Sequence, residues 1–164
     1  ALKRTNEGDW ITYADAGCTL KNENKVSLTD LISNMIISNK VISAFPCKGY
    51  AERVFTKGDI LNYFFCKDNL DITETDIFVG GIITFKNCQQ ARDFFQTLFD
   101  ITKTHQFFLD DSSSVSPNLD GFLENRHDQS LLSVFRKLNP ELVYITEDRT
   151  WKSDFFIQAE RLRE

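Results

Sequence analysis

Asp15 is the first side chain along the sequence whose type and position could do chemistry. It lies in the segment Tyr13–Cys18, Y-A-D-A-G-C, directly after a short apolar run. An acidic residue at the carboxyl end of a strand lies where open α/β sheets place their ligands, and a carboxylate there can hold a divalent cation that neutralises a diphosphate. Asp and Gly are also common turn residues, so the spacing alone slightly favours a plain turn.

A second polar cluster directly precedes an expected helix. Residues 125–130 read N-R-H-D-Q-S, and Asp128 is placed to be the helix N-cap. The same helix N-terminus presents free backbone N–H groups to anions, so capping is compatible with a catalytic role. His127 alone would be weak support for a site, but beside Asp128 and Gln129 it indicates one.

A glycine pair, Gly80-Gly81, lies inside the β-rich run Phe78–Phe85. Glycine weakens the interior of a strand, so its use there indicates a bulge or a close approach by a ligand or another backbone. A bulge with no ligand nearby and a close approach by a ligand or backbone are about equally supported by this pattern.

Two further pairs of charged residues could contact a polar or phosphorylated ligand. Lys57 and Asp59, in T-K-G-D, could bind a phosphate and a sugar hydroxyl, or equally be solvated residues of a first helical turn. Arg161 and Arg163 could grip a diphosphate, although a solvated chain end is the default interpretation.

Alternating strands and helices must position these residues. Apolar runs predict strands at Asp9–Ala14, Val41–Phe45, ended by Pro46, and Leu142–Thr146. The first of these is nearly all apolar, which suits a sheet covered on both faces. The alternation favours an α/β architecture with a parallel or mixed sheet. Helical spacing and caps predict helices from Ser27 or Thr29 to Asn39, Thr56 to Phe65, Cys88 or Gln89 to Thr104, and Asp128 to Leu138, and a long loop at His105–Arg126 is of the kind that is often functional.

Composition narrows the class of protein. The 164 residues fit one domain, and a net charge of −5 argues against broad nucleic-acid binding. No apolar run approaches the ~20 residues of a membrane-spanning helix. The four cysteines are scattered and form no C-x-x-C pair, which favours free thiols in a reducing compartment and hence a cytoplasmic protein.

The order of the motifs resembles a known family. The succession Y-A-D-A-G-C, T-K-G-D, G-G-I-I-T-F-K-N, R-H-D-Q-S-L-L-S and A-E-R-L-R is similar to small GT-A-fold glycosyltransferases of bacteria and large viruses, and more distantly to glycogenin-like transferases. The resemblance covers Asp9 to Arg163. It implies a Rossmann-like mixed sheet flanked by helices, with residues 1–164 forming one domain: the C-terminal part of a GT-A domain that lacks the N-terminal nucleotide-binding portion.

The resemblance also implies an activity: transfer of a sugar from a nucleotide-sugar donor to a hydroxyl of a glycan or other acceptor. A fragment of this kind can be inactive by itself. The implied catalytic residues are Asp128, as the catalytic or sugar-orienting carboxylate, and Gln129. The implied donor-binding residues are Asp15, which would also contact a Mn²⁺ or Mg²⁺ ion, Ala16, Gly17, Lys57, Asp59, Gly80, Gly81, His127, Arg161 and Arg163.

One departure from the family pattern leaves other functions open. Gly17 stands where a D-x-D motif has its second Asp, so the usual two-carboxylate grip on a metal is incomplete. The main alternative is a non-catalytic sugar- or protein-binding module that keeps the fold. A phosphate-handling hydrolase or nucleotidyltransferase ranks last, because the sequence has no Gly-rich phosphate loop.

Overall fold

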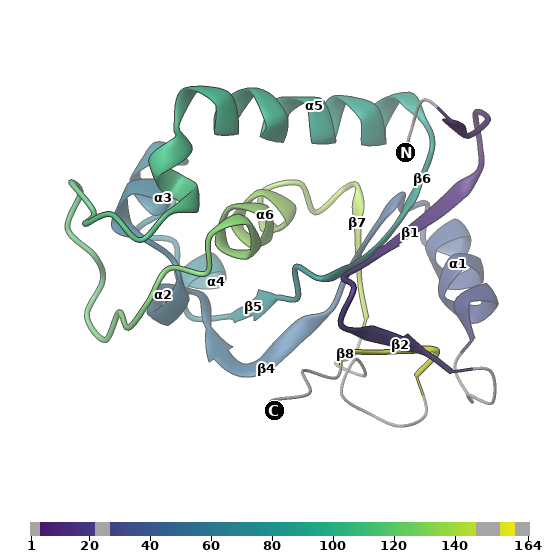
Figure 1. The fold of residues 1–164 in the computed structure, drawn as a ribbon, viewed down its shortest axis with the longest axis horizontal. Helices are drawn as coiled ribbons and strands as arrows, with labels where there is room; N and C mark the ends of the chain where they lie inside the picture. The colour runs from purple at the N-terminus through teal and green to yellow at the C-terminus, as the bar shows by residue number, and fades with distance from the viewer. Residues whose placement is uncertain (1–3, 22–26, 147–154, 160–164) are drawn as a thin grey trace. The chain divides into compact units, whose positions relative to one another are not determined.

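The computed structural model describes residues 4–21, 27–146 and 155–159. They fall into two compact units, which are described separately (Figure 1). The first unit comprises Ala1–Phe45, Gly81–Asp93 and Pro140–Glu164, and the second comprises Pro46–Gly80 and Phe94–Asn139. The single domain expected from the sequence stays a prediction.

The first unit contains a mixed four-stranded sheet in the order β1-β6-β3-β7 (Figure 1). Strand β6 runs antiparallel to both of its neighbours, and β3 and β7 are parallel. Ile42 of β3 and Ile82 of β6 are fully buried, so the core of this unit lies on the central strands. The strands are β1 (Trp10–Ala14), β3 (Ile42–Ala44), β6 (Ile82–Lys86) and β7 (Val143–Ile145).

Helix α1, a second strand pair and the start of helix α5 (Gln89–Thr104) belong to the rest of this unit. Helix α1 (Leu28–Ile37) begins at Ser27, whose hydroxyl accepts from the Asp30 N–H, while the Asp30 carboxylate accepts from the Ser27 N–H. This reciprocal capping box satisfies two otherwise free helix donors. Strand β2 (Cys18–Leu20) pairs antiparallel with β8 (Ile157–Ala159).

The second unit combines a strand pair with short helices. Strands β4 (Pro46–Ala51) and β5 (Asp76–Phe78) pair antiparallel with an irregular register. Helix α5 (Gln89–Thr104) begins in the first unit and continues into the second. The other helices are α2 (Glu52–Phe55), α3 (Gly58–Tyr63), α4 (Leu70–Thr73), the 3₁₀ helix η2 (Gln106–Leu109) and α6 (Asp128–Lys137).

A buried ionic network lies at the centre of the second unit. Glu52 is fully buried, and its carboxylate accepts from the hydroxyls of Thr56 and Ser133, both at 2.6 Å, and from Lys137 Nζ at 2.7 Å. Arg136 is also fully buried and donates to the Val79 carbonyl at 2.8 Å. Buried charges need such partners because their desolvation costs several kcal/mol per ion.

The structure confirms most of the predicted elements. Strands at 10–14, 42–44 and 143–145 and helices at 28–37, 89–104 and 128–137 lie where apolar periodicity and capping residues placed them. All four cysteines are free thiols, as expected. Within the described residues, no helix is long and apolar enough to cross a membrane.

Two expectations about the elements are wrong, and two others hold with shifted bounds. The run at 78–85 is the end of β5 and most of β6, which belong to different sheets, so the glycine pair separates two strands. Strand β3 ends before Pro46, as expected, and Pro46 itself begins β4, where it pairs with Phe78. The helix expected within Thr56 to Phe65 is present as α3 and begins at Gly58. Strand β1 ends the described sheet with Tyr13 51% exposed, so it is not covered on both faces.

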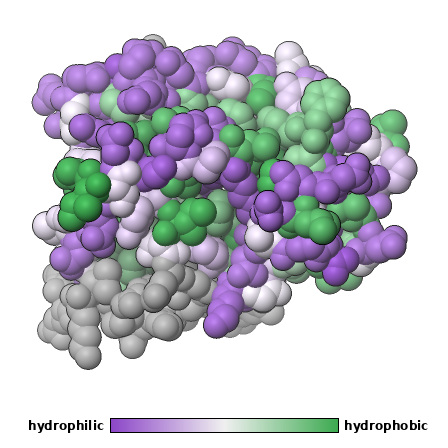
Figure 2. Space-filling view, turned by 180° about the vertical axis from the view of Figure 1, so that it is seen from behind, coloured by the Kyte–Doolittle hydropathy of each residue, from purple (hydrophilic) through white to green (hydrophobic). Residues whose placement is uncertain are grey.

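Exposed apolar side chains occur in both units. Ile37 in the first and Phe65 in the second are 82% and 96% exposed. On the face shown in Figure 2, separate apolar groups are interspersed among hydrophilic residues. Scattered apolar residues of this kind are normal on soluble proteins and identify no interface.

Candidate functional site

Asp15 lies in the first unit at the end of β1, on an exposed turn. The Cys18 N–H donates to the Asp15 carbonyl at 2.9 Å, which closes a turn over the exposed residues Ala16 and Gly17. The turn interpretation is therefore confirmed for the backbone. The carboxylate itself remains accessible and is oriented by the Tyr13 hydroxyl, which donates to Oδ1 at 2.6 Å. A turn and an available carboxylate coexist here.

Gly81 lies directly beneath this carboxylate. The Asp15 N–H donates to the Gly81 carbonyl at 2.9 Å, which holds the two segments together. A Cβ atom added to Gly81 would overlap Asp15 Oδ2 and lie 2.9 Å from its Cγ. Only glycine therefore lets the carboxylate occupy this position. The close approach expected of the glycine pair is real at Gly81, and what approaches is a predicted site residue.

The turn supplies one carboxylate toward a metal ion. In the described part of the chain, no group of three or more His, Cys, Asp or Glu side chains could hold an ion. Mg²⁺ is commonly bound through one or two carboxylates together with substrate phosphates. Asp15 therefore fits an ion only where a bound diphosphate supplies the remaining ligands.

The Cys18 thiol belongs to the same turn and is half-buried. Burial raises its pKa, and the nearby Asp15 carboxylate raises it further. The thiol is therefore mainly protonated near neutral pH and is a slow nucleophile.

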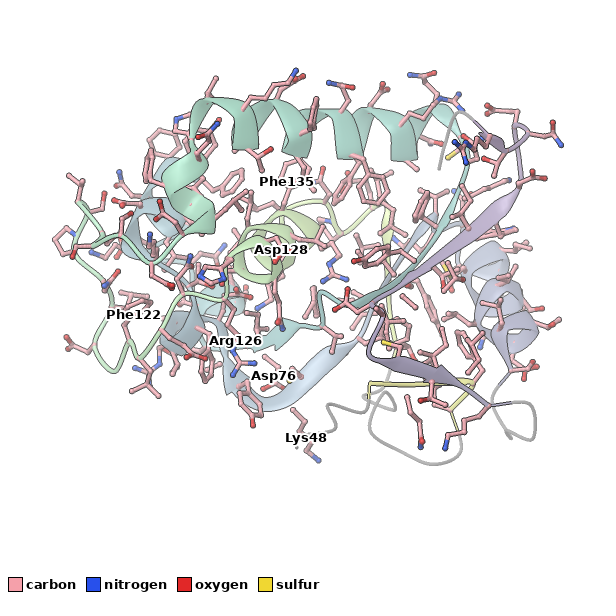
Figure 3. The ribbon with its side chains drawn as sticks, viewed as in Figure 1. Lys48, Asp76, Phe122, Arg126, Asp128 and Phe135 are labelled. Carbon is pink, nitrogen blue, oxygen red and sulfur yellow. The ribbon has the colours of Figure 1, made fainter. Side chains whose placement is uncertain are left out.

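The second predicted cluster begins helix α6 in the second unit. The N-cap is His127, with a φ of +51° and no side-chain cap hydrogen bond, so the expectation that Asp128 caps the helix is wrong. Asp128 is instead the first helical residue and is exposed (Figure 3). Within the described residues, no hydrogen bond to its carboxylate is found. A carboxylate in a first helical turn is stabilised by the helix dipole.

The residues around Asp128 are held by structural contacts. Gln129 Nε2 donates to the Phe78 carbonyl at 3.1 Å, and a Cβ on Gly80 would lie 3.0 Å from the Gln129 Cβ. Gly80 thus makes room for the start of α6. His127 Nε2 lies 2.8 Å from Asp111 Oδ1. None of these contacts involves Asp128, which stays free to act on a ligand.

Arg126, the first residue of R-H-D-Q-S, makes contacts with neighbouring side chains of the second unit. Its guanidinium lies over the rings of Phe55 and Tyr50, 4.4 and 5.1 Å from their centroids, and its Nε lies 3.2 Å from a Glu124 oxygen (Figure 3). Cation–π contacts of this kind are attractive, so they help to hold the segment that directly precedes α6 in position.

Lys57 and Asp59 are buried, so their interpretation as solvated first-turn residues is wrong. Lys57 Nζ donates to the Phe107 carbonyl at 2.7 Å and to Asp110 and Ser112, each at 3.2 Å. All three ammonium donors therefore have partners in the second unit. The contact predicted between Lys57 and a donor phosphate has no free donor to make it.

Asp59 anchors the same loop from the other side. Its carboxylate accepts from the Val115 N–H at 3.0 Å and from the Ser116 N–H at 2.6 Å. The Gly58 N–H donates to Asn118 Oδ1 at 2.7 Å, and a Cβ at Gly58 would lie 2.6 Å from the Ser116 carbonyl oxygen. The T-K-G-D segment is thus the attachment point of the long loop. We therefore assign Lys57 and Asp59 a structural role and do not include them in the proposed donor site.

The anchored loop borders an open cavity of about 420 Å³ in the second unit. The sequence indicates that this loop is of a kind that is often functional, but of the lining residues it singles out only Lys57 and Asn125. The only signal was its richness in Ser, Asp and Asn, which does not separate residues that face a cavity from residues that face solvent. The lining residues are Lys57, Asp111, Ser112, Ser113, Ser114, Asn118, Phe122, Leu123, Glu124 and Asn125.

The structure places the predicted residues in two clusters. Asp15, Ala16, Gly17 and Gly81 lie together in the first unit. Gly80, His127, Asp128 and Gln129 surround the start of α6 in the second unit. Arg161 and Arg163 lie outside the described residues.

Comparisons with known proteins do not assign this chain to a family. No protein-family model matches the chain, and a search of curated proteins found no match. Among solved structures, the apo form of mouse xyloside xylosyltransferase 1 is similar, with a TM-score of 0.46 and 11% sequence identity. The match covers 87% of this chain and 46% of that one, so this chain spans less than half of that structure. A likeness this distant assigns neither an activity nor a site.

Proposed function

We propose that this protein is a glycosyltransferase that moves a sugar from a nucleotide-sugar donor to a hydroxyl of a glycan or another acceptor. One observation carries the proposal: Asp15 of Y-A-D-A-G-C lies against Gly81 of G-G-I-I. These segments are far apart in the sequence, and the family resemblance assigns both to the donor site. Their contact supports that assignment, because a plain turn would not need a glycine beneath its carboxylate.

In this proposal, Asp15 binds the donor. Its carboxylate is exposed and oriented by Tyr13, so it can accept from a ribose hydroxyl or share a divalent cation with the diphosphate. A Mn²⁺ or Mg²⁺ ion would be held by Asp15 and the donor phosphates, and it would neutralise the leaving diphosphate. Ala16 and Gly17 leave the surface of the turn free of bulky side chains.

The transfer step requires a base if it inverts the anomeric configuration. The bond between the sugar C1 and the diphosphate oxygen breaks, a bond forms between C1 and the acceptor oxygen, and the hydroxyl proton passes to a base. We assign the base to Asp128, which is exposed and has no partner among the described residues. In a retaining enzyme, Asp128 would orient the transferred sugar. Gln129 and His127 hold its helix turn in place.

Calorimetric titration of the chain with UDP- and GDP-sugars, with and without Mn²⁺, tests donor binding. We expect binding that Asp15→Asn weakens by about tenfold or more, the range for a charged hydrogen bond. Asp9→Asn, which changes another exposed acidic residue of the same unit, is the matched control and should bind as the unchanged chain does. Absence of binding with every nucleotide sugar would contradict the proposal.

Release of nucleoside diphosphate in the presence of an acceptor tests the role of Asp128. If Asp128 is the base, Asp128→Asn should lower kcat by about 10²–10⁴-fold with little change in donor affinity. Normal turnover by this variant would remove Asp128 from the mechanism.

A non-catalytic sugar- or protein-binding module is the second candidate. The single carboxylate at the turn favours it, since among the described residues no fuller set of metal ligands is present. This function predicts that the chain binds glycans or a protein partner and that calorimetry detects no binding of any nucleotide sugar, with or without Mn²⁺.

A further inference from the structure

We propose that the cavity in the second unit binds a neutral sugar ring through Asp111, Ser113, Asn118, Phe122 and Glu124. Its use as the acceptor subsite rests on the proposed function, whereas sugar binding itself does not. The cavity volume of about 420 Å³ lies in the range of small-molecule sites and exceeds what a single sugar ring needs.

The cavity is held open by contacts along the whole loop. Besides the bonds to Lys57 and Asp59, the Asn125 amide donates to the Phe108 carbonyl at 2.9 Å, and the Leu123 N–H donates to the Val54 carbonyl at 2.9 Å. Lys67 Nζ donates to the Pro117 carbonyl at 2.9 Å. A pocket ordered in advance loses less conformational entropy when a ligand binds.

The lining offers the groups that a neutral polyol recognises. Asn118 uses its Oδ1 for the Gly58 N–H, so its amide NH₂ group stays available as a donor. The Ser113 hydroxyl has no hydrogen-bond partner in the described part of the chain, and it can donate and accept. Asp111 and Glu124 supply carboxylate oxygens, which only accept. Sugar hydroxyls both donate and accept, so they match this mixed set.

The Phe122 ring supplies the apolar part of the site. It belongs to the returning limb of the loop and is half-buried (Figure 3). Pockets for small ligands combine apolar or aromatic walls with a few placed polar groups. The C–H face of a sugar ring can pack on Phe122 while its hydroxyls meet the polar wall.

The charges of the lining disfavour other ligand classes. A phosphate or nucleotide would meet the carboxylates of Asp111 and Glu124. The lining cation, Lys57, already donates to Phe107, Asp110 and Ser112. A cationic ligand is not needed to balance the two carboxylates, because Asp111 lies 2.8 Å from His127 Nε2 and Glu124 lies 3.2 Å from Arg126 Nε. A neutral hydroxylated ligand remains the best match.

Titration of the ¹⁵N-labelled chain with the methyl glycosides of xylose, glucose, galactose and mannose, and with their disaccharides, tests the proposal. At least one sugar should shift the amide signals of Ser113, Asn118 and Phe122 in a saturable way, with no donor present. Glu124→Gln and Phe122→Leu should each weaken that binding by about tenfold. The matched controls Asp120→Asn and Phe65→Leu change an exposed acid of the same loop and an exposed ring outside the lining, and they should bind normally.

Several results would overturn the proposal: no sugar shifts these signals, the controls weaken binding as much as the lining variants, or UDP or a simple amine binds the cavity in place of sugars. Thermal unfolding midpoints equal to that of the unchanged chain would show that the variants are folded. The two proposals fail separately. If a sugar binds the cavity but no nucleotide sugar binds the chain, the cavity proposal stands and the glycosyltransferase proposal is contradicted. If a nucleotide sugar binds through Asp15 but no sugar shifts the cavity signals, the glycosyltransferase proposal stands and the cavity proposal is contradicted.

Discussion

At the scale of single residues, the glycine pair has two separate reasons to be glycine. Gly81 makes room for the Asp15 carboxylate, and Gly80 makes room for Gln129 at the start of α6. The sequence indicated close approach at this pair without indicating what approaches. A position that only glycine can occupy is therefore as informative about a site as a charged residue is, because it shows where a neighbouring side chain must lie.

Gly81→Ala should move the Asp15 carboxylate with little effect on the free energy of unfolding. The added methyl group overlaps the end of the exposed Asp15 side chain, which can rotate away, so we expect a loss of less than about 1 kcal/mol in unfolding free energy. The displaced carboxylate should bind the donor as poorly as Asp15→Ala does. Calorimetry of both variants and of the double variant checks this. A double variant much weaker than either single variant would show that Gly81 acts independently of Asp15.

At the scale of elements, the T-K-G-D segment and the long loop form one structural unit through the contacts of two carboxylates, Asp59 and Asp110. Burial raises the pKa of Asp59, but the Ser116 and Val115 N–H groups and two serine hydroxyls outweigh it, and the net pKa is lowered. Hydrogen bonds from Ser112 and Lys57 lower the pKa of Asp110 to about 2, from 3.8. Both carboxylates are therefore held in their charged form by the folded loop.

These lowered pKa values predict that acid detaches the loop. A carboxylate with a lowered pKa in the folded state stabilises that state above its unfolded pKa, and the contribution is lost as the pH falls through the folded pKa. We expect the amide signals of Val115 and Ser116, which donate to Asp59, to change only as the pH falls below the ordinary Asp value of 3.8. Asp59→Asn should flatten this transition. An unchanged acid transition in that variant would contradict the anchoring role.

At the scale of the whole molecule, the stability of the second unit depends on the buried Glu52 network. Glu52→Ala would leave Lys137 and Arg136 buried without their carboxylate, and breaking a buried pair in this way costs about 3–5 kcal/mol. Glu74→Ala removes an exposed partner of Arg53, 3.1 Å away, and should cost no more than about 1 kcal/mol. Urea unfolding of the two variants compares the costs. Equal losses would mean that Glu52 is not the centre of the network.

Much of the secondary structure could be predicted from the sequence because it depends on local signals. Ser27 starts α1 as expected, and the apolar spacing of α5 gave its bounds closely. Strand direction and partners have no such signal, so the antiparallel course of β6 and the division of the run at Gly80-Gly81 were missed. The burial of Lys57 and Asp59 could not be predicted, because their partners lie some fifty positions away in the sequence.

The Cys18 thiol makes the turn at Asp15–Cys18 accessible to covalent footprinting. Cys47 and Cys66 are buried, and burial raises the pKa of Cys66 to about 11, so a mild alkylating reagent should label only Cys18 and Cys88. Because Cys18 shares the turn with Asp15, a bound nucleotide sugar should slow its labelling while Cys88 keeps its rate as an internal reference. Mass spectrometry of timed iodoacetamide reactions would therefore measure occupancy of the turn in a single sample, without knowledge of the acceptor and without turnover.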